Sequence, residues 1–133
     1  MKRRWTLLLI SMSLLLTSCH PGTQMEVVNN AGQDLTVVSM DTELKEAVYS
    51  VGSNQTVRIK VPYKLRVQHK DGIWNYDLPS TPPPKNFRKR IRGNWYLEKY
   101  QIEKDGAIYV KLPDSQGLTD LPPQPAGFPV RAK

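Results

Sequence analysis

Cysteine, histidine and long apolar runs are all scarce in this chain of 133 residues. Cys19 is the only cysteine, so no disulfide within the chain can stabilise the fold. The longest apolar run, residues 5–16, spans about a dozen residues, whereas a helix needs about twenty to cross a bilayer core. These absences exclude a disulfide-stapled scaffold and a membrane-spanning helix.

Recognisable catalytic motifs are also absent. The two histidines, His20 and His69, belong to no nucleophile–base pattern, and no Gly-x-Ser-x-Gly sequence occurs. Asp41, Glu43 and Glu46 lie close together, but the Asp-x-Asp-x-Asp-Gly pattern of a calcium loop is missing. The sequence therefore predicts a protein that is not an enzyme and uses no metal or cofactor. Paired carboxylates far apart in the sequence, as in sugar hydrolysis, stay open.

The N-terminal segment has the layout of a secretory signal. Lys2, Arg3 and Arg4 give it a positive start, a short apolar core follows, and small residues precede a helix-breaking stretch at residues 18–22. A buried core helix is the other interpretation. The segment is apolar on every side, and the helix-breaking residues 18–22 end it abruptly. Neither property suits a buried core helix, so the pattern favours the signal.

The residues Leu16-Thr17-Ser18-Cys19 resemble the lipobox of bacterial lipoproteins, which is a branched apolar residue and two small residues before a cysteine. The resemblance covers residues 1–19 and implies cleavage after Ser18 and acylation of Cys19. At least two acyl chains would then hold the protein firmly on a membrane. Because His20 and not aspartate follows the cysteine, the resemblance favours the periplasmic face of the outer membrane, with the inner membrane as the alternative.

The mature chain has room for one small domain. Without Lys2, Arg3 and Arg4 the net charge falls by three from the +7 of the whole sequence, so part of the basic character belongs to the signal. About 115 residues remain, enough for one core. We expect a cleaved signal at residues 1–18, a tether at 19–24, a domain at 25–112 and a proline-rich tail at 113–133 that is disordered or extended.

Seven or eight short strands are predicted, and no helix is convincing. The clearest is residues 55–61, where Val57, Ile59 and Val61 alternate with polar residues. Asp71-Gly72 predicts a hairpin between residues 63–70 and 73–78. The other expected strands are residues 25–28, 35–40, 47–51, 95–103 and 107–112. This pattern predicts an all-β fold, a small antiparallel β-sandwich of the immunoglobulin-like or transthyretin-like kind.

A basic loop at residues 85–95 is the main candidate for a functional site. No acidic residue occurs between Asp77 and Glu98. The candidate binding residues are Lys85, Phe87, Arg88, Lys89, Arg90, Arg92 and Trp95. A solvated loop with no binding role is the simplest interpretation. Nucleic acid suits such a run, but an envelope location argues against it, whereas an anionic membrane surface near the tether attracts it.

Two classes of function follow. The first is a lipid-anchored, non-enzymatic binding or accessory module of the cell envelope, with anionic lipid, peptidoglycan or an envelope protein as its partner. A free edge at residues 55–61 could add a partner strand. The second is a small hydrolase or carbohydrate-acting enzyme, which a cleft lined by converging carboxylates or by His69 would favour.

Overall fold

The computed structural model describes residues 22–62 and 64–133. The signal segment, the lipobox with Cys19, the first part of the tether and position 63 lie outside the described residues.

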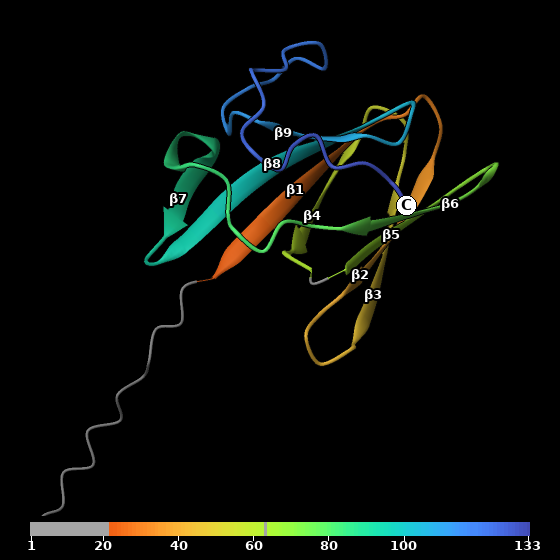
Figure 1. Ribbon diagram of the computed structural model, residues 1–133, viewed down its shortest axis with the longest axis horizontal. Helices are drawn as coiled ribbons and strands as arrows, with labels where there is room; N and C mark the ends of the chain where they lie inside the picture. Colours follow the sequence, from red (N-terminus) through yellow and green to blue (C-terminus); the bar gives the residue numbers. More distant parts are fainter. Residues whose placement is uncertain (1–21, 63) are drawn as a thin grey trace, which may run out of the picture.

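Nine strands form two sheets in the described part of the chain (Figure 1). The strands are β1 (Thr23–Asn30), β2 (Leu35–Met40), β3 (Glu46–Val51), β4 (Thr56–Lys60), β5 (Lys64–His69), β6 (Gly72–Asp77), β7 (Arg88–Arg92), β8 (Trp95–Glu103) and β9 (Ile108–Lys111). One 3₁₀ turn, η1 (Lys85–Phe87), precedes β7. The expected all-β sandwich is confirmed.

The smaller sheet has the order β3-β2-β5-β6 and is antiparallel throughout. Its inner face carries Leu35 and Val37 from β2, Leu65 and Val67 from β5, and Tyr76 from β6. These residues recur at every second position, so each strand presents one apolar face to the core. The predicted hairpin joins β5 to β6, with His69 paired to Gly72 at its closed end.

The larger sheet contains a pairing that the sequence did not predict. Its order is β4-β1-β8-β7, and β1 runs parallel to β8 while the other pairs are antiparallel. β7 pairs with the first half of one edge of β8, and β9 pairs with the second half of the same edge. β8 therefore has three partner strands.

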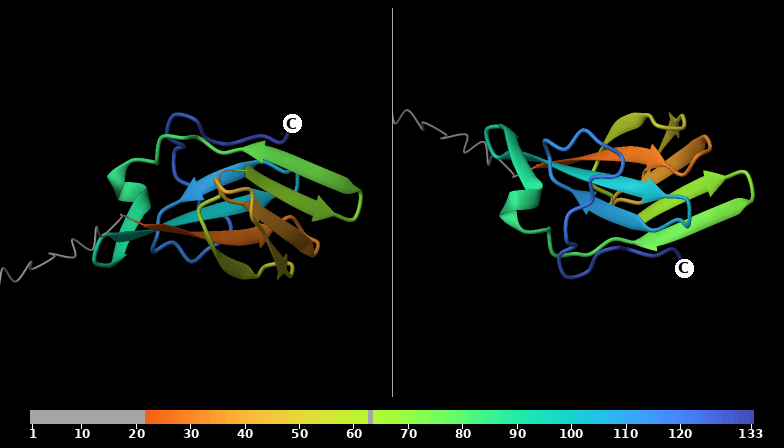
Figure 2. Two further views of the ribbon diagram at one scale, coloured as in Figure 1. Left: turned by 90° about the horizontal axis from the view of Figure 1, so that it is seen from below. Right: turned by 90° about the horizontal axis from the view of Figure 1, so that it is seen from above.

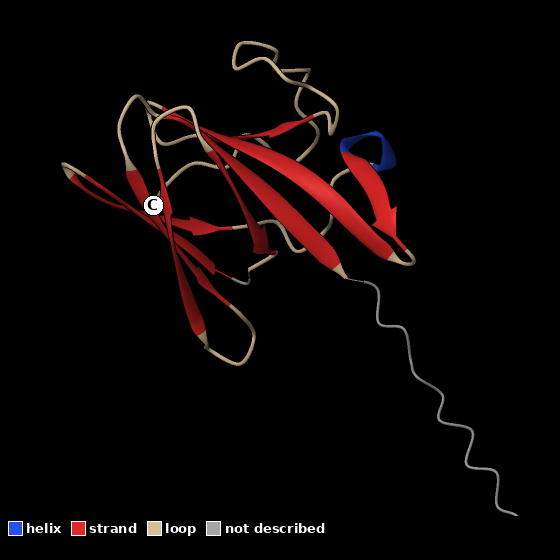
Figure 3. Ribbon diagram, turned by 180° about the vertical axis from the view of Figure 1, so that it is seen from behind, coloured by secondary structure: helices blue, strands red, loops and turns tan. Residues whose placement is uncertain are grey.

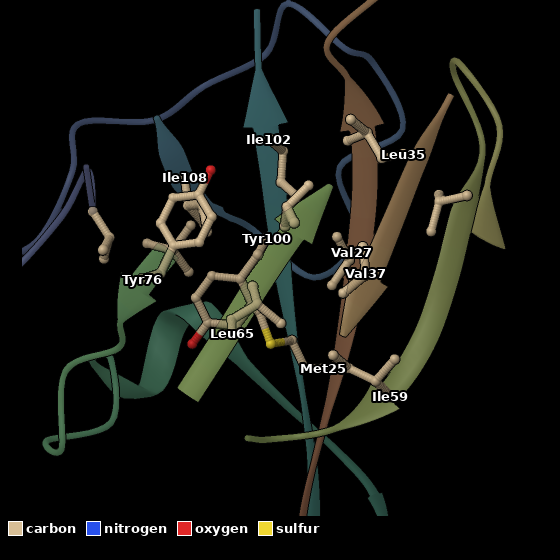
Figure 4. Packing of buried hydrophobic residues seen from close by; sticks show 14 of the residues in the cluster. Met25, Val27, Leu35, Val37, Ile59, Leu65, Tyr76, Tyr100, Ile102 and Ile108 are labelled. Atoms are coloured by element: carbon tan, nitrogen blue, oxygen red, sulfur yellow. The ribbon is translucent and has the colours of Figure 1, made fainter. Parts of the chain in front are cut away.

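The core lies between the two sheets (Figure 4). Its two tyrosines, Tyr76 and Tyr100, are almost fully buried, and their hydroxyl groups point toward opposite ends of the sandwich. The Tyr76 hydroxyl donates to Gly106 O at 2.7 Å, in the β8–β9 turn. The Tyr100 hydroxyl donates to the carboxylate of Glu98. Both polar atoms are thus satisfied inside an apolar core.

The Asn29 side chain stabilises the β1–β2 turn through hydrogen bonds. It is fully buried, donates from Nδ2 to Gln33 O (2.7 Å) and Val51 O (2.9 Å), and accepts the Ala31 N–H at Oδ1 (2.9 Å). One amide group therefore joins the β1–β2 turn to the end of β3, and no buried donor or acceptor of Asn29 is left unpaired.

The proline-rich tail contains no regular strand, and it packs on the domain (Figure 2). Val130 exchanges two backbone hydrogen bonds with Ile108 (2.8 and 2.9 Å) and joins the core cluster. The Gln124 side chain pairs with both backbone groups of Val110 at 2.9 Å. These bonds cover the free edge of β9, so the core extends beyond the predicted boundary at residue 112.

Lysines on the outer face of the larger sheet hold the first part of the tail. Lys99 Nζ donates to Ser115 O at 2.9 Å. Lys111, which is 1% exposed, donates to Gln101 Oε1 at 2.8 Å and also to the Gly117 carbonyl. Burial lowers the pKa of Lys111. Carbonyl oxygens of the tail thus accept hydrogen bonds from both lysines. In a disordered tail, water would take their place.

Candidate functional site

The predicted basic loop is a β-hairpin. Residues 88–92 form β7 and pair with residues 95–98 of β8, so the expectation of a loop throughout residues 85–95 was wrong. The strand escaped prediction because its sequence, Arg-Lys-Arg-Ile-Arg, shows no apolar alternation. β7 forms because its backbone pairs with β8. Its charged side chains are mostly exposed, so apolar burial contributes little to the strand.

The hairpin tip, defined as residues 90–95, carries the exposed part of the candidate site. Arg92 pairs with Trp95 across a turn in which Gly93 adopts a φ of +50°, a left-handed conformation that glycine tolerates. A register shift separates Arg90 from Arg92, and the Arg90 Nε donates to the Gly93 carbonyl. Arg90 and Arg92 are exposed, with Ile91 39% and Trp95 36% exposed beside them.

Two of the predicted binding residues point inward instead. Phe87 is 5% exposed and belongs to the core cluster, so it is not available to a surface or a partner. Arg88 Nε lies 3.2 Å from Glu98 Oε1, and the guanidinium stacks 4.4 Å from the Tyr96 ring. The sequence grouped both residues with the exposed cations because interleaved charges hide which residue of a strand faces inward.

The remaining two cations of the predicted site, Lys85 and Lys89, lie away from the hairpin tip. Lys85 is exposed in η1. Lys89 Nζ makes an exposed ion pair with Asp114 Oδ1 at 2.8 Å, and that carboxylate raises the pKa of Lys89. Such exposed pairs contribute little to stability because water screens them. The structure therefore reduces the exposed cluster at the tip to Arg90, Arg92, Ile91 and Trp95.

The hairpin tip lies beside the start of β1, as the two views of Figures 1 and 3 show. Tyr96 N donates to Gly22 O at 3.0 Å, and the parallel pairing of β1 with β8 begins at Thr23 and Tyr96. A Cβ atom on Gly22 would clash with the Trp95 ring. The tip therefore contacts the first residue that the structure describes. We call this end of the sandwich the proximal end and the opposite one the distal end.

A shallow groove accompanies the tip. Gln24, Ile91, Arg92, Asn94 and Trp95 line it together with Gly93, and its volume is about 510 Å³. Ile91 and Trp95 give its lining apolar surface, and Arg92 gives it a positive charge. This combination of an aromatic ring, an aliphatic side chain and a guanidinium group suits the boundary between lipid headgroups and acyl chains.

A second hollow, a cleft of about 390 Å³, also lies at the proximal end. The segment between β6 and η1 lines this cleft with Pro79, Pro82 and Pro83. Glu98 and Tyr100 of β8 line the cleft together with Arg88 and Thr23. Burial is the main cause that raises the pKa of Glu98, and burial also raises the pKa of Tyr100 well above its usual range. No sequence signal had singled out Glu98.

The other candidates from the sequence stay apart from both hollows. The His69 ring stacks on Trp74 with centroids 4.1 Å apart, and its Nδ1 accepts the Asp71 N–H at 3.3 Å. Asp41 Oδ1 accepts the N–H groups of Glu43 and Lys45, both at 2.9 Å. His69 and Asp41 therefore have local structural roles, and neither lines the cleft.

The predicted free edge at residues 55–61 is present. β4 is the end strand of the larger sheet and pairs with β1. No group of His, Cys, Asp and Glu side chains suited to a metal ion occurs among residues 22–62 and 64–133. Within these same residues, no helix has the length and apolar character to cross a bilayer.

No protein-family model matches the sequence, and no curated protein matches it either. Among solved structures, the chain is similar to an NMR structure of a protein from Eubacterium rectale, with a TM-score of 0.38 and 16% sequence identity. The alignment covers 76% of this chain and 95% of that one. A likeness of this size carries no argument about function, which must come from the geometry above.

Proposed function

We propose that the protein is a lipid-anchored, non-enzymatic module of the cell envelope whose hairpin tip contacts an anionic lipid surface. The observation that carries this proposal is the contact between Trp95 of the tip and Gly22, next to the hydrogen bond from Tyr96 N to Gly22 O. Gly22 follows Cys19 by three residues, which can span at most about 10 Å. An acylated Cys19 would therefore hold the tip within about one Debye length of the headgroups.

The energetics give the tip an orienting role. Each arginine near an anionic surface contributes on the order of 1 kcal/mol, so Arg90 and Arg92 together would contribute about 2 kcal/mol. Acyl chains contribute about 0.8 kcal/mol for each buried CH₂ group, which is far more. Acylation would thus attach the protein, and the tip would set which end of the sandwich faces the bilayer. Trp95 and Ile91 suit the headgroup level.

The non-enzymatic part of the proposal rests on the cleft. Glu98 is the one carboxylate among its described lining residues, whereas glycoside hydrolysis requires two carboxyl groups about 5–10 Å apart. Glu98 is also engaged by Arg88 and Tyr100. A localisation at the periplasmic face of the outer membrane, with the inner membrane as the alternative, follows from the lipobox and His20. Peptidoglycan or an envelope protein, bound along β4, is the alternative partner.

Vesicle co-sedimentation of the mature chain with Cys19→Ser tests the proposal without acyl chains. We expect binding to vesicles that contain phosphatidylglycerol, weak binding to phosphatidylcholine alone, and a roughly thirtyfold loss of affinity in the R90S/R92S variant, because two phosphate-facing charges are gone. Lys70→Ser with Lys104→Ser is the matched control, since both lysines are exposed in distal turns. Equal binding to both vesicle types, or equal losses in the two double variants, would contradict the proposal.

A further inference from the structure

The cleft at the proximal end differs chemically from the rest of the sandwich interior. Its floor holds a carboxylate, a guanidinium and a phenol in positions where neighbouring strands carry apolar side chains. Glu98 is only 3% exposed. Burying such charges costs several kcal/mol per ion unless they are paired, and an apolar trio would fill the same space without that cost. A buried charged cluster that lines a cleft is a candidate binding site.

The three polar side chains leave hydrogen-bonding capacity unused. Glu98 receives the Tyr100 hydroxyl at one carboxylate oxygen and has Arg88 Nε 3.2 Å from the other. Arg88 Nε is itself buried without a well-aligned hydrogen bond. A guanidinium group carries five N–H donors, and the close approach of Arg88 to Glu98 involves Nε. A ligand in the cleft could therefore accept from Arg88 and donate to the remaining lone pairs of Glu98.

The pairing of Arg88 with Glu98 indicates which net charge a ligand in the cleft should have. The two charges already neutralise each other, so the cleft floor attracts neither sign strongly. An anion or a cation would have to separate the pair, and leaving one partner buried and unpaired costs about 3–5 kcal/mol. A neutral molecule with adjacent hydroxyl groups can hydrogen-bond to both side chains while the pair stays intact.

The walls match the same kind of ligand. Thr23, Ser80 and Thr81 add hydroxyl groups around the charged floor, and Leu78, Pro82 and Phe128 add apolar surface. Sugar rings present both hydroxyl edges and C–H faces, so they need this mixture. The volume of about 390 Å³ lies near the lower end of the roughly 300–1,000 Å³ typical of small-molecule sites. The space suits a short saccharide and not a folded polymer.

We propose that this cleft binds a neutral saccharide, held by the Arg88–Glu98 pair and bounded by the proline segment. With one carboxylate in the lining, the site would bind the sugar without cleaving its glycosidic bond. This inference does not depend on lipid binding by the hairpin tip. It concerns a separate hollow, and its first test contains no membrane.

Titration of the mature Cys19→Ser chain, followed by amide NMR shifts, tests the inference with three probes: maltose, N,N′-diacetylchitobiose and glucuronic acid. We expect at least one neutral disaccharide to bind with millimolar affinity or better and to shift amides near Glu98 and Thr81. Glucuronic acid should bind at least tenfold more weakly, because its carboxylate competes with Glu98. No binding by either neutral sugar, or tighter binding by the acid, would overturn the inference.

The variants separate binding at the cleft from binding elsewhere. R88M with E98Q removes both charges and leaves no buried ion unpaired, so the fold is retained while affinity should fall at least tenfold. Ser80→Ala with Thr81→Ala changes only the exposed rim and should reduce affinity two- to fivefold. Ser50→Ala, at an exposed serine on β3, is the matched control. Unchanged affinity in the first two variants would overturn the inference.

A last arm distinguishes a free sugar from a lipid-linked one. Phosphatidylcholine vesicles with and without diglucosyl diacylglycerol offer the same neutral surface, so the hairpin tip contributes equally to both. Stronger co-sedimentation with the glycolipid, abolished in R88M/E98Q, would assign the cleft to a membrane glycolipid. Binding of the soluble disaccharide alone would assign it to a free or polymer-end sugar.

Discussion

The β5–β6 and β7–β8 hairpins have similar shapes but are stabilised in different ways. The β5–β6 hairpin places Leu65, Val67 and Tyr76 in the core, all at most 2% exposed. β7 contributes Arg88 as its one inward-facing charged contact, and its other four residues are exposed. Apolar burial therefore determines the first hairpin, whereas pairing with β8 and one partly buried ion pair determine the second. A strand without an apolar face, such as β7, can expose its cations at little cost to the fold.

Truncating one core residue should show this difference most strongly. Leu65→Ala removes a fully buried side chain of β5, so we expect it to lower the free energy of unfolding by about 3 kcal/mol. Ile91→Ala in β7 removes a half-exposed side chain and should change it by less than about 0.5 kcal/mol. Urea titration of the Cys19→Ser chain measures both. Equal losses would mean that the two hairpins share one kind of stabilisation.

Arg88→Met is the change expected to destabilise the β7–β8 hairpin most. It leaves Glu98 buried without its cation, and we expect a loss of about 3 kcal/mol at neutral pH. The same urea titration measures it, with R88M/E98Q as the control, because that variant has no unpaired charge. If the double variant is as unstable as the single one, packing of the arginine stem, and not charge, explains the loss.

The pH dependence of stability isolates Glu98. Its pKa is raised in the folded state, mainly by burial, so the folded protein binds the proton more tightly than the unfolded chain does. The resulting stabilisation is present below the unfolded pKa and is lost as the pH rises through the folded pKa. Relative to the parent, E98Q should therefore gain stability between pH 4 and pH 7. A relative loss over this range would mean that Arg88 outweighs burial.

The smallest effect is expected at the exposed ion pair of β7. Lys89→Ser removes the partner of Asp114, but both side chains are more than half exposed, so the urea midpoint should stay within error of the parent. Asp114 nevertheless has a lowered pKa, chiefly through its hydrogen bond with Lys89. An NMR titration of Asp114 should show its pKa rising toward the ordinary value in the variant. An unchanged Asp114 pKa would mean that the pair does not form in solution.

Prediction from the sequence succeeded where apolar residues alternate and failed where polar residues are buried. The strands around Leu65 and Ile59 were evident because their apolar period of two has one structural meaning. β7 has no such period, and its pairing depends on β8, which lies beyond it in the sequence. Asn29 and Glu98 are polar residues whose burial depends on contacts with Val51 and Arg88. Only the three-dimensional arrangement supplies those contacts.

The tail and the cleft were beyond sequence reasoning for a related reason. The prolines led to the expectation of a disordered or extended tail at residues 113–133, and no sequence pattern indicated that Val130 reaches the core. The isolated apolar residues Phe128 and Val130 were the available signal. The cleft combines residues from β1, β7, β8 and the proline segment, so no local pattern could reveal it. For the candidate site, the sequence grouped Arg90, Arg92 and Trp95, but it did not indicate that Arg88 faces inward toward Glu98.

The parallel pairing of β1 with β8 has a mechanical consequence. A force applied at the N-terminal end of the domain and opposed at its distal end would pull β1 along its own axis, between β8 on one side and β4 on the other. Bonds that run across the pulling direction are loaded together in shear, whereas a hairpin pulled at its open end breaks one pair at a time. β8, held in turn by β7 and β9, would distribute that load over the sheet. A domain of this topology is suited to hold under tension at its N-terminus.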